Sequence, residues 1–316
     1  MKKQNNYISN HIMKKFSLIL LIAMISGTAF AQQLPLYSQY MYNRMLINPA
    51  VTGSEQGIPI TLTAKQQWVG IDNAPSTQVL SAHTLLNNGT MGVGGMIYSD
   101  KFGSENRIGI QANYSYMLPL FYDSHLSFGL SFQVFQYQLD YRDIIAFDAN
   151  DPAISNYSIE SSWLPETDFG LYLFNDYYFV GLSANQMIEL PVKIGGQEVD
   201  LNRLIRHYNL MGGYKFNLKN DFEIEPSALI KGTFKSPFQF DINVKGIYQE
   251  NYWLGLSYRT DGDIITILGL HYDPINFGLA IDFATSEISS VQHGSFEIFV
   301  KYTIDTKSKN IGKSKF

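Results

Sequence analysis

Residues 107–136 read RIGIQANYSYMLPLFYDSHLSFGLSFQVFQ, and two segments of this stretch alternate apolar and polar side chains. In the first segment the apolar residues occupy the even positions, at Ile108, Ile110, Ala112, Tyr114 and Tyr116. After a short turn at 118–124, the same alternation runs from 126 to 134. Because successive side chains of a strand point to opposite faces, the stretch predicts a β-hairpin with one apolar and one polar face.

The length and composition of this hairpin favour a membrane-spanning strand pair over a soluble sheet. Each strand is about ten residues long and its apolar face ends in aromatics, as expected for strands that cross an outer membrane. Aromatic residues make up 14% of the chain, and charged residues 16% against a usual figure of about 25%. There is no cysteine, and the net charge of −5 gives no reason to expect a nucleic-acid partner.

Twelve further segments of similar pattern lead to a fold-class prediction. We expect an all-β protein, a transmembrane antiparallel β-barrel of about 14 strands over residues 58–304, with short periplasmic turns and longer extracellular loops. The expected strands are 58–69, 77–86, 91–99, 107–117, 125–139, 168–174, 177–186, 207–218, 222–234, 238–249, 252–260, 264–272, 275–284 and 295–304.

The connections between these strands sort by length. Every second connection is a tight turn rich in Asn and Asp: 87–89, 122–123, 175–176, 219–221, 250–251 and 273–274. The alternate set contains the long ones, at 100–106, 140–167, 187–206 and 285–294. If the chain enters from the periplasm, this parity places both termini in the periplasm of an outer-membrane protein.

The segments outside the barrel have their own signatures. Residues 1–31 combine four lysines, an apolar run at 16–25 and the sequence Ala29-Phe30-Ala31, which predicts a removable signal peptide. The run is too short to span a bilayer. Met13 is an alternative start to Met1. Residues 32–57 lack strand alternation and predict a segment that plugs the barrel or lies in the periplasm; residues 305–316 form a basic periplasmic tail.

The longest predicted loop, 140–167, is the candidate partner-binding region, since loops of this length are functional or disordered. Its candidate contact residues are Asp148, Asp151, Glu160, Trp163 and Glu166. The alternative is an ordinary solvated loop. The two aspartates match no complete calcium site, and we expect no metal and no cofactor.

The polar faces of the strands should line the lumen. Strand parity assigns to this face Gln111, Asn113, Ser131, Gln133, Lys231, Asp241, Asn243, Lys245, Arg259 and Asp282. We favour a lumen filled with salt bridges between the three cations and the two aspartates, and the alternative is a charged constriction in a conducting pore. The histidines have no metal-ligand spacing and there is no Gly-x-Ser-x-Gly elbow, so no enzyme activity is expected.

The N-terminal motif resembles the opening of the PorP/SprF family, outer-membrane barrels of type IX secretion in Bacteroidetes. The matching residues are Ser38-Gln39-Tyr40-Met41, Asn48-Pro49-Ala50 and Gly53, preceded by Gln32. Later matches are 181–185, 213–216, 225–227 and the most specific stretch, 253–259. Phe296 stands where the family often has His, and 279–282 read LAID where it often has Tyr-Ser-Tyr-Asp.

This resemblance implies a non-enzymatic barrel that helps to export, or anchors, a secreted surface protein such as a gliding adhesin. It also implies partners: outer-membrane lipid, the C-terminal region of the cargo, and periplasmic secretion or gliding machinery. The alternative is a FadL-like outer-membrane channel for hydrophobic small molecules, whose N-terminal plug can also include Asn-Pro-Ala.

Overall fold

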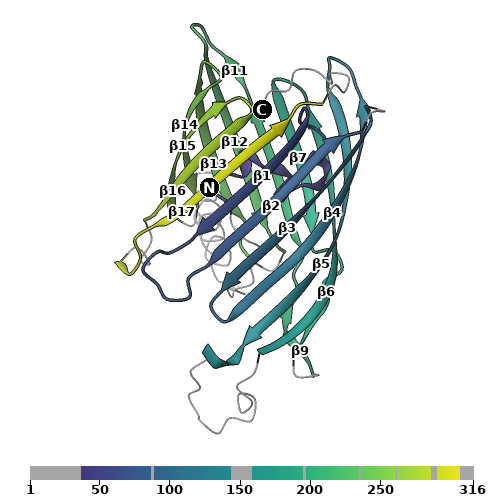
Figure 1. Ribbon diagram of the computed structural model, residues 1–316, viewed down its shortest axis with the longest axis vertical. Coiled ribbons are helices and arrows are strands. Elements are labelled where there is room, and N and C mark those ends of the chain that lie inside the picture. Colours follow the sequence, from purple (N-terminus) through teal and green to yellow (C-terminus); the bar gives the residue numbers. More distant parts are fainter. Residues whose placement is uncertain are drawn as a thin grey trace, which may run out of the picture.

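Antiparallel strands that close into a tilted barrel dominate the computed structural model (Figure 1). The structure describes residues 37–86, 89–143, 159–194, 197–234, 236–260, 262–285 and 290–306. The predicted signal peptide, Asp148, Asp151 and residues 307–316 therefore lie outside the described residues. Among the helices of these ranges, none has the length and apolarity to cross a membrane.

The barrel strands agree with the predicted set in number and order. They are β1 (Ile58–Gln66), β2 (Ser76–Leu85), β3 (Met91–Phe102), β4 (Glu105–Pro119), β5 (His125–Asp140), β6 (Ile159–Phe174), β7 (Tyr178–Asn185), β10 (His207–Tyr214), β11 (Phe216–Asn217), β12 (Phe222–Gly232), β13 (Gln239–Tyr248), β14 (Tyr252–Arg259), β15 (Asp263–Tyr272), β16 (Ile275–Ala284) and β17 (Ser295–Ile304).

The sheet closes at two junctions. β1 pairs with β17, and β10 pairs with β12. The two-residue β11 continues β10 past Lys215 and pairs with the same partner, β12. Counting β10 and β11 as one strand gives the closed 14-strand antiparallel barrel that the sequence predicts.

The two ends of the barrel differ in their connections, and we name them the short-turn end and the long-loop end. At the short-turn end, Tyr122-Asp123 and Asn220-Asp221 have positive φ at both residues, the geometry of tight hairpin turns. The predicted long loop at 100–106 is wrong, because the β3–β4 ladder continues to a pair between Phe102 and Glu105. The predicted loop 140–167 is also too long, because β6 already begins at Ile159.

The barrel exterior carries an apolar band with aromatic residues towards both ends. Exposed aliphatic side chains on its strands include Leu62, Ile97, Ile110, Leu130, Val180, Leu210, Val244, Leu256 and Val300. Exposed aromatics at the short-turn end include Phe121, Tyr177, Phe222, Tyr252 and Tyr272. Those at the long-loop end include Phe102, Trp163, Phe240, Tyr258 and Phe283. This is the belt that lipid requires of a transmembrane barrel.

One side of the wall is taller than the other at the long-loop end (Figure 1). β5 and β6 each have 16 residues, whereas β14 has eight. The outward side chains of the extension include Ile159 and Trp163 as well as polar residues. Among the polar ones, Gln138 bridges Asn106 and Gln136 by hydrogen bonds. On its inner side, a small apolar core joins β5 and β6 to the hairpin of β8 (Pro191–Ile194) and β9 (Gln197–Arg203).

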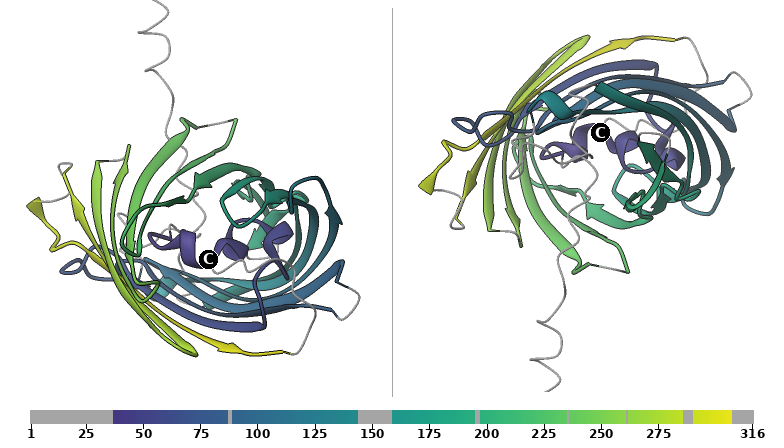
Figure 2. Two further views of the ribbon diagram at one scale, coloured as in Figure 1. Left: turned by 90° about the horizontal axis from the view of Figure 1, so that it is seen from above. Right: turned by 90° about the horizontal axis from the view of Figure 1, so that it is seen from below.

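Residues 37–57, which we call the plug, lie inside the barrel (Figure 2). The plug contains three 3-10 turns, η1 (Tyr40–Tyr42), η2 (Arg44–Leu46) and η3 (Pro49–Val51). Asn48 caps η3 by accepting a hydrogen bond from the backbone N–H of Ala50 at 2.9 Å, and Pro49 occupies the first turn, where a missing N–H is harmless.

A row of small residues on the wall makes room for η3. Across five neighbouring strands, the register aligns Gly92, Ser115, Gly129, Gly170 and Ser183. A Cβ on Gly129 would clash with the backbone of Ala50, and one on Gly92 with the carbonyl of Thr52. The two serines use the close approach, since Ser115 Oγ donates to Thr52 O at 2.6 Å and Ser183 Oγ to Ile47 O at 2.8 Å.

This contact predicts the effect of one methyl group. Gly129→Ala should displace η3 from the wall and destabilise the plugged barrel by about 1–3 kcal/mol, the usual range for overpacking. The measurement is protease sensitivity of the plug in the folded, detergent-solubilised protein. Gly246→Ala is the control, because the nearest atom to a Cβ there lies 3.8 Å away; equal sensitivity of the two variants would contradict the packing argument.

Candidate functional site: the plugged lumen

The first plug residues hold two buried carboxylates of the wall. Glu297 accepts hydrogen bonds from the backbone N–H groups of Ser38 at 2.6 Å and Gln39 at 2.9 Å. Ser38 Oγ donates to Asp282 at 2.6 Å and accepts from Lys65 Nζ at 2.6 Å. Lys65 also lies 3.0 Å from Asp282 and 3.7 Å from Glu297. One lysine and the Ser-Gln pair thus compensate two acids from different strands.

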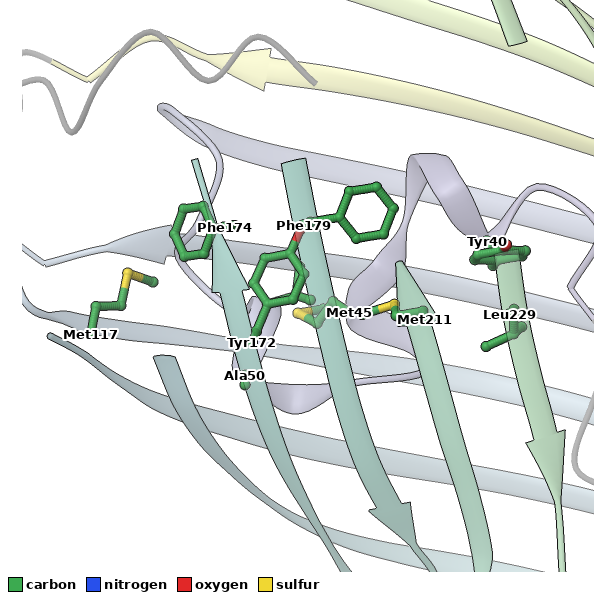
Figure 3. Close-up of a cluster of buried hydrophobic side chains, with 10 residues drawn as sticks. Tyr40, Met45, Ala50, Met117, Tyr172, Phe174, Phe179, Met211 and Leu229 are labelled. Carbon is green, nitrogen blue, oxygen red and sulfur yellow. The ribbon is translucent and has the colours of Figure 1, made fainter. Parts of the chain in front are cut away.

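The next two motif residues point to opposite walls. Tyr40 and Met45 pack with Tyr172, Phe179 and other buried residues of β6 to β12 (Figure 3). The Tyr40 hydroxyl accepts a hydrogen bond from Asn243 at 2.7 Å. Met41 packs with Trp253, Phe299 and their neighbours on β14 to β17. Burial raises the pKa of the Tyr40 phenol far above its usual range, so the hydroxyl stays neutral.

Arg44 brings a plug cation to the wall. Its guanidinium lies 3.1 Å from Glu225 and stacks over the ring of Phe179, with 3.9 Å between the guanidinium carbon and the ring centroid. Lys245 approaches the same carboxylate at 2.8 Å. Since an unpaired buried charge costs several kcal/mol, Glu225 requires these cations, and one of them belongs to the plug.

The end of the plug is fixed near the short-turn end. Asn48 Nδ2 donates to Leu171 O at 2.9 Å and Leu182 O at 3.3 Å. The N–H of Gly53, whose φ is +79°, donates to His83 Nδ1 at 3.1 Å. Glu55 pairs with Lys301 at 2.8 Å and with His83 at 3.7 Å. Burial opposes ionisation of Glu55, but these two partners lower its pKa to about 2.

The structure brings the predicted lumen residues together, but some of them pair with residues outside the predicted set. Arg259 and Asp241 pair at 3.1 Å, but Asp282 pairs with Lys65 and Lys245 with Glu225. Lys231 lines the lumen cavity at the long-loop end. The residues that sequence reasoning missed are Arg44, Glu55, Lys65, His83, Glu225, Glu297 and Lys301. Those on strands share the inward parity of the predicted set, which is the signal that identifies them.

Two cavities flank the plug. The long-loop cavity has a volume of about 100 Å³ and is lined by Tyr37 and Ile47 of the plug with polar wall residues such as Arg107 and Asp168. The short-turn cavity has a volume of about 430 Å³, and its plug residues are Tyr42, Glu55 and Gln56. The cavities share no lining residue, so the plug separates them.

The described part of the predicted partner-binding set divides between two faces. Trp163 is 64% exposed and lies on the exterior of β6. Glu166 is fully buried, and its carboxylate accepts hydrogen bonds from the backbone N–H groups of Ile188 at 3.0 Å and Glu189 at 2.9 Å. Glu166 therefore fastens the connection between β7 and β10 instead of presenting a surface. Glu160 lies at the start of β6 and is half-buried.

Solved structures that share this architecture are bacterial barrels. The Ralstonia pickettii toluene transporter TbuX matches with a TM-score of 0.53 at 10% identity, covering 82% of this chain and 92% of that one. The Pseudomonas putida toluene transporter TodX gives 0.50 at 11% identity, with 82% and 92% covered. The monoaromatic hydrocarbon channel CymD gives 0.50 at 12% identity, with 86% and 94% covered. No curated protein matches this chain in sequence.

The class of protein is defined by three findings together: the closed antiparallel wall, the lipid-facing belt and the structural neighbours. The protein is an outer-membrane β-barrel. Within that class of protein, the sequence identifies the family. The family model for the type IX secretion system membrane protein PorP/SprF matches residues 29–302. The chain belongs to the PorP/SprF family, whose members are associated with secretion and not with enzymatic catalysis.

The buried acids make the plug's attachment testable. Glu297→Leu should leave the N–H groups of Ser38 and Gln39 without acceptors and Lys65 with one partner fewer, at a cost of about 3–5 kcal/mol. We expect higher conductance in planar bilayers because the plug loosens. Glu223→Leu is the control, since Glu223 lines the same lumen. Unchanged conductance and unchanged plug protection in the Glu297 variant would contradict the assignment.

The low pKa of Glu55 predicts a pH dependence. Because its pKa in the folded protein lies below the ordinary value of about 4.3, its ion pairs stabilise the protein above pH ~4.5 and this contribution disappears as the pH falls towards 2. Denaturant unfolding in detergent should show wild type more stable than Glu55→Gln by up to about 3 kcal/mol at pH 7. A difference between the two proteins that does not shrink on acidification would exclude this origin.

Proposed function

We propose that this protein is a non-enzymatic barrel of the type IX secretion or gliding system that anchors, or helps to export, a secreted surface protein such as an adhesin. Family membership supports the secretion role. The observation that carries the anchoring role is the plug: its contacts with Glu225, Asp282 and Glu297 fill the lumen with paired, buried charges. A tether needs a stable barrel and no open pore.

The long-loop end offers the larger surface for the secreted partner. There the wall rises along β5 and β6, and the β8–β9 hairpin packs against the inner side of that rise. The connection 144–158, which contains Asp148 and Asp151, joins the same two strands. We assign this end to the cell exterior and the short-turn end, with both termini, to the periplasm, where secretion or gliding machinery is available.

The alternative function is transport of hydrophobic small molecules. TbuX and TodX are toluene transporters and CymD is a monoaromatic hydrocarbon channel, and at their identities the likeness extends to fold alone. The long-loop cavity disfavours such a ligand here, because its volume of about 100 Å³ lies below the range of small-molecule sites, about 300–1,000 Å³.

The anchoring proposal predicts the outcome of a loop deletion. Removing residues 144–158 leaves β5 and β6 intact, so the barrel should still fold and show its heat-dependent mobility on SDS gels. Surface display of the cargo, measured by labelling of intact cells, should fall by at least roughly tenfold, which corresponds to about 1.4 kcal/mol of lost binding. Deleting residues 286–289 in another connection at the same end is the control.

The cargo itself can be identified by gentle detergent pull-down from native outer membranes. A large secreted protein in near-stoichiometric yield that depends on residues 144–158 supports the tether. Normal display by the deletion variant, or a barrel that co-purifies only with lipid, contradicts it and favours the channel.

A further inference from the structure

In the described part of the wall, β6 has a stretch with a neighbouring strand on one side only. It pairs with β5 along its whole length, but its ladder with β7 covers only residues 169–174. Above this ladder the contact continues by one backbone hydrogen bond, from the N–H of Met187 to Thr167 O at 3.0 Å. Among the described residues, no strand pairs with the β7 side of residues 159–165. We call this side of residues 159–165 the β6 edge.

Strand geometry determines which backbone groups lie on the β6 edge. In an antiparallel ladder the N–H and C=O of one residue point to the same neighbouring strand, and successive residues alternate between the two neighbours. Because Thr167 bonds to the chain after β7, the odd-numbered residues direct their backbone groups away from β5. Ile159, Ser161 and Trp163 therefore present an N–H and a C=O each, whereas Pro165 presents a C=O alone. A proline at this position leaves the ladder to β5 intact.

The segment that follows β7 is held on the inner side of the wall. Gln186 has a positive φ of 58°, and its N–H donates to the carboxylate of Asp168 at 2.9 Å. The carboxylate of Glu166 accepts from the N–H groups of Ile188 at 3.0 Å and Glu189 at 2.9 Å. The β8–β9 hairpin that comes next packs against the inner core of β5 and β6. Two buried acids thus divert this segment inward, away from the β6 edge.

The β6 edge lies above the apolar band of the wall. Exposed Phe132 and Phe169 belong to that band, whereas the β5 residues opposite the edge include Gln136 and Gln138, which are hydrogen-bonded to each other at 3.0 Å. An open sheet edge does not occur in hydrocarbon, because its backbone groups would find no partner there. The β6 edge is therefore open to water at the long-loop end.

The chemistry of the edge specifies an extended polypeptide as its ligand. A row of N–H and C=O groups is the template to which a further β-strand adds. The side chains of Ile159 and Trp163 on the outer face of this row are 51% and 64% exposed, which favours apolar side chains on the added strand. We propose, on the basis of the anchoring role, that the β6 edge binds an extended segment of the secreted protein, which joins the wall as a strand beside β6.

A proline substitution tests this proposal, since Pro165 shows that this side of β6 accepts the residue. Ser161→Pro removes one edge-directed N–H, and its ring obstructs an incoming strand, while the ladder to β5 is kept. Retention of the secreted protein in a gentle detergent pull-down should fall by about tenfold. Ser161→Ala is the matched control, because it removes the same hydroxyl and keeps the N–H, and its retention should stay within about twofold of wild type. Heat-dependent mobility on SDS gels verifies that both barrels are folded.

Amide hydrogen exchange examines the edge without the partner. In the isolated full-length barrel, the N–H groups of Ser161 and Trp163 should exchange at least roughly tenfold faster than those of Glu160, Ser162 and Leu164, because only the latter must first break a ladder hydrogen bond to β5. In the complex with the secreted protein, this alternation should disappear, because the added strand accepts hydrogen bonds from the edge.

The outcomes for the β6 edge and for the anchoring role are distinguishable. Equal retention of the secreted protein by Ser161→Pro and Ser161→Ala overturns the edge as its binding site and leaves the anchoring role intact. Slow exchange at Ser161 and Trp163 in the isolated barrel overturns it as well, because the protein's own chain or a second copy then covers the edge. A wild-type barrel that retains no secreted protein contradicts the anchoring role itself, and with it the partner assigned to this edge.

Discussion

The plug and the barrel wall are bound to each other by the cost of burying charge. Glu297 and Glu225 are almost completely inaccessible, and the plug supplies backbone N–H groups to one and a guanidinium to the other. A buried carboxylate without such partners is strongly unfavourable. The acids of the wall are therefore stable in a plugged lumen and would be poorly accommodated in an empty one. The folding of the barrel thus depends on the docking of the plug.

Strand alternation explains why so much of the fold was predictable from the sequence. Lipid outside and a polar lumen inside impose period two along nearly every strand, which is why 14 strands, their order and the inward parity of Arg259 or Asp282 could be predicted. The ends of β3, β4 and β6 were wrong because their ladders run beyond the band where lipid enforces the alternation. Glu166 looked like a loop residue for the same reason.

The contacts between the plug and the wall could not be predicted from the sequence. A motif of Ser38, Gln39, Asn48 and Gly53 could be noticed in the sequence, but its contacts are with residues far along the chain, up to 259 positions away between Ser38 and Glu297. No periodicity relates such positions, so the partner of Asp282 was assigned wrongly. The small-residue row from Gly92 to Ser183 was equally hidden, because it exists only in the register between strands.

The unequal height of the wall gives the barrel a direction within the plane of the membrane. β5 and β6 have six residues more than β17, which adds about 20 Å along the strand. A barrel with a level rim has the same height on every side. A barrel with a slanted rim has one side that is taller than all others. Neighbouring proteins in the bilayer would thus meet either a tall, hydrogen-bonded blade or a low edge, and a complex assembled around this barrel acquires a front and a back.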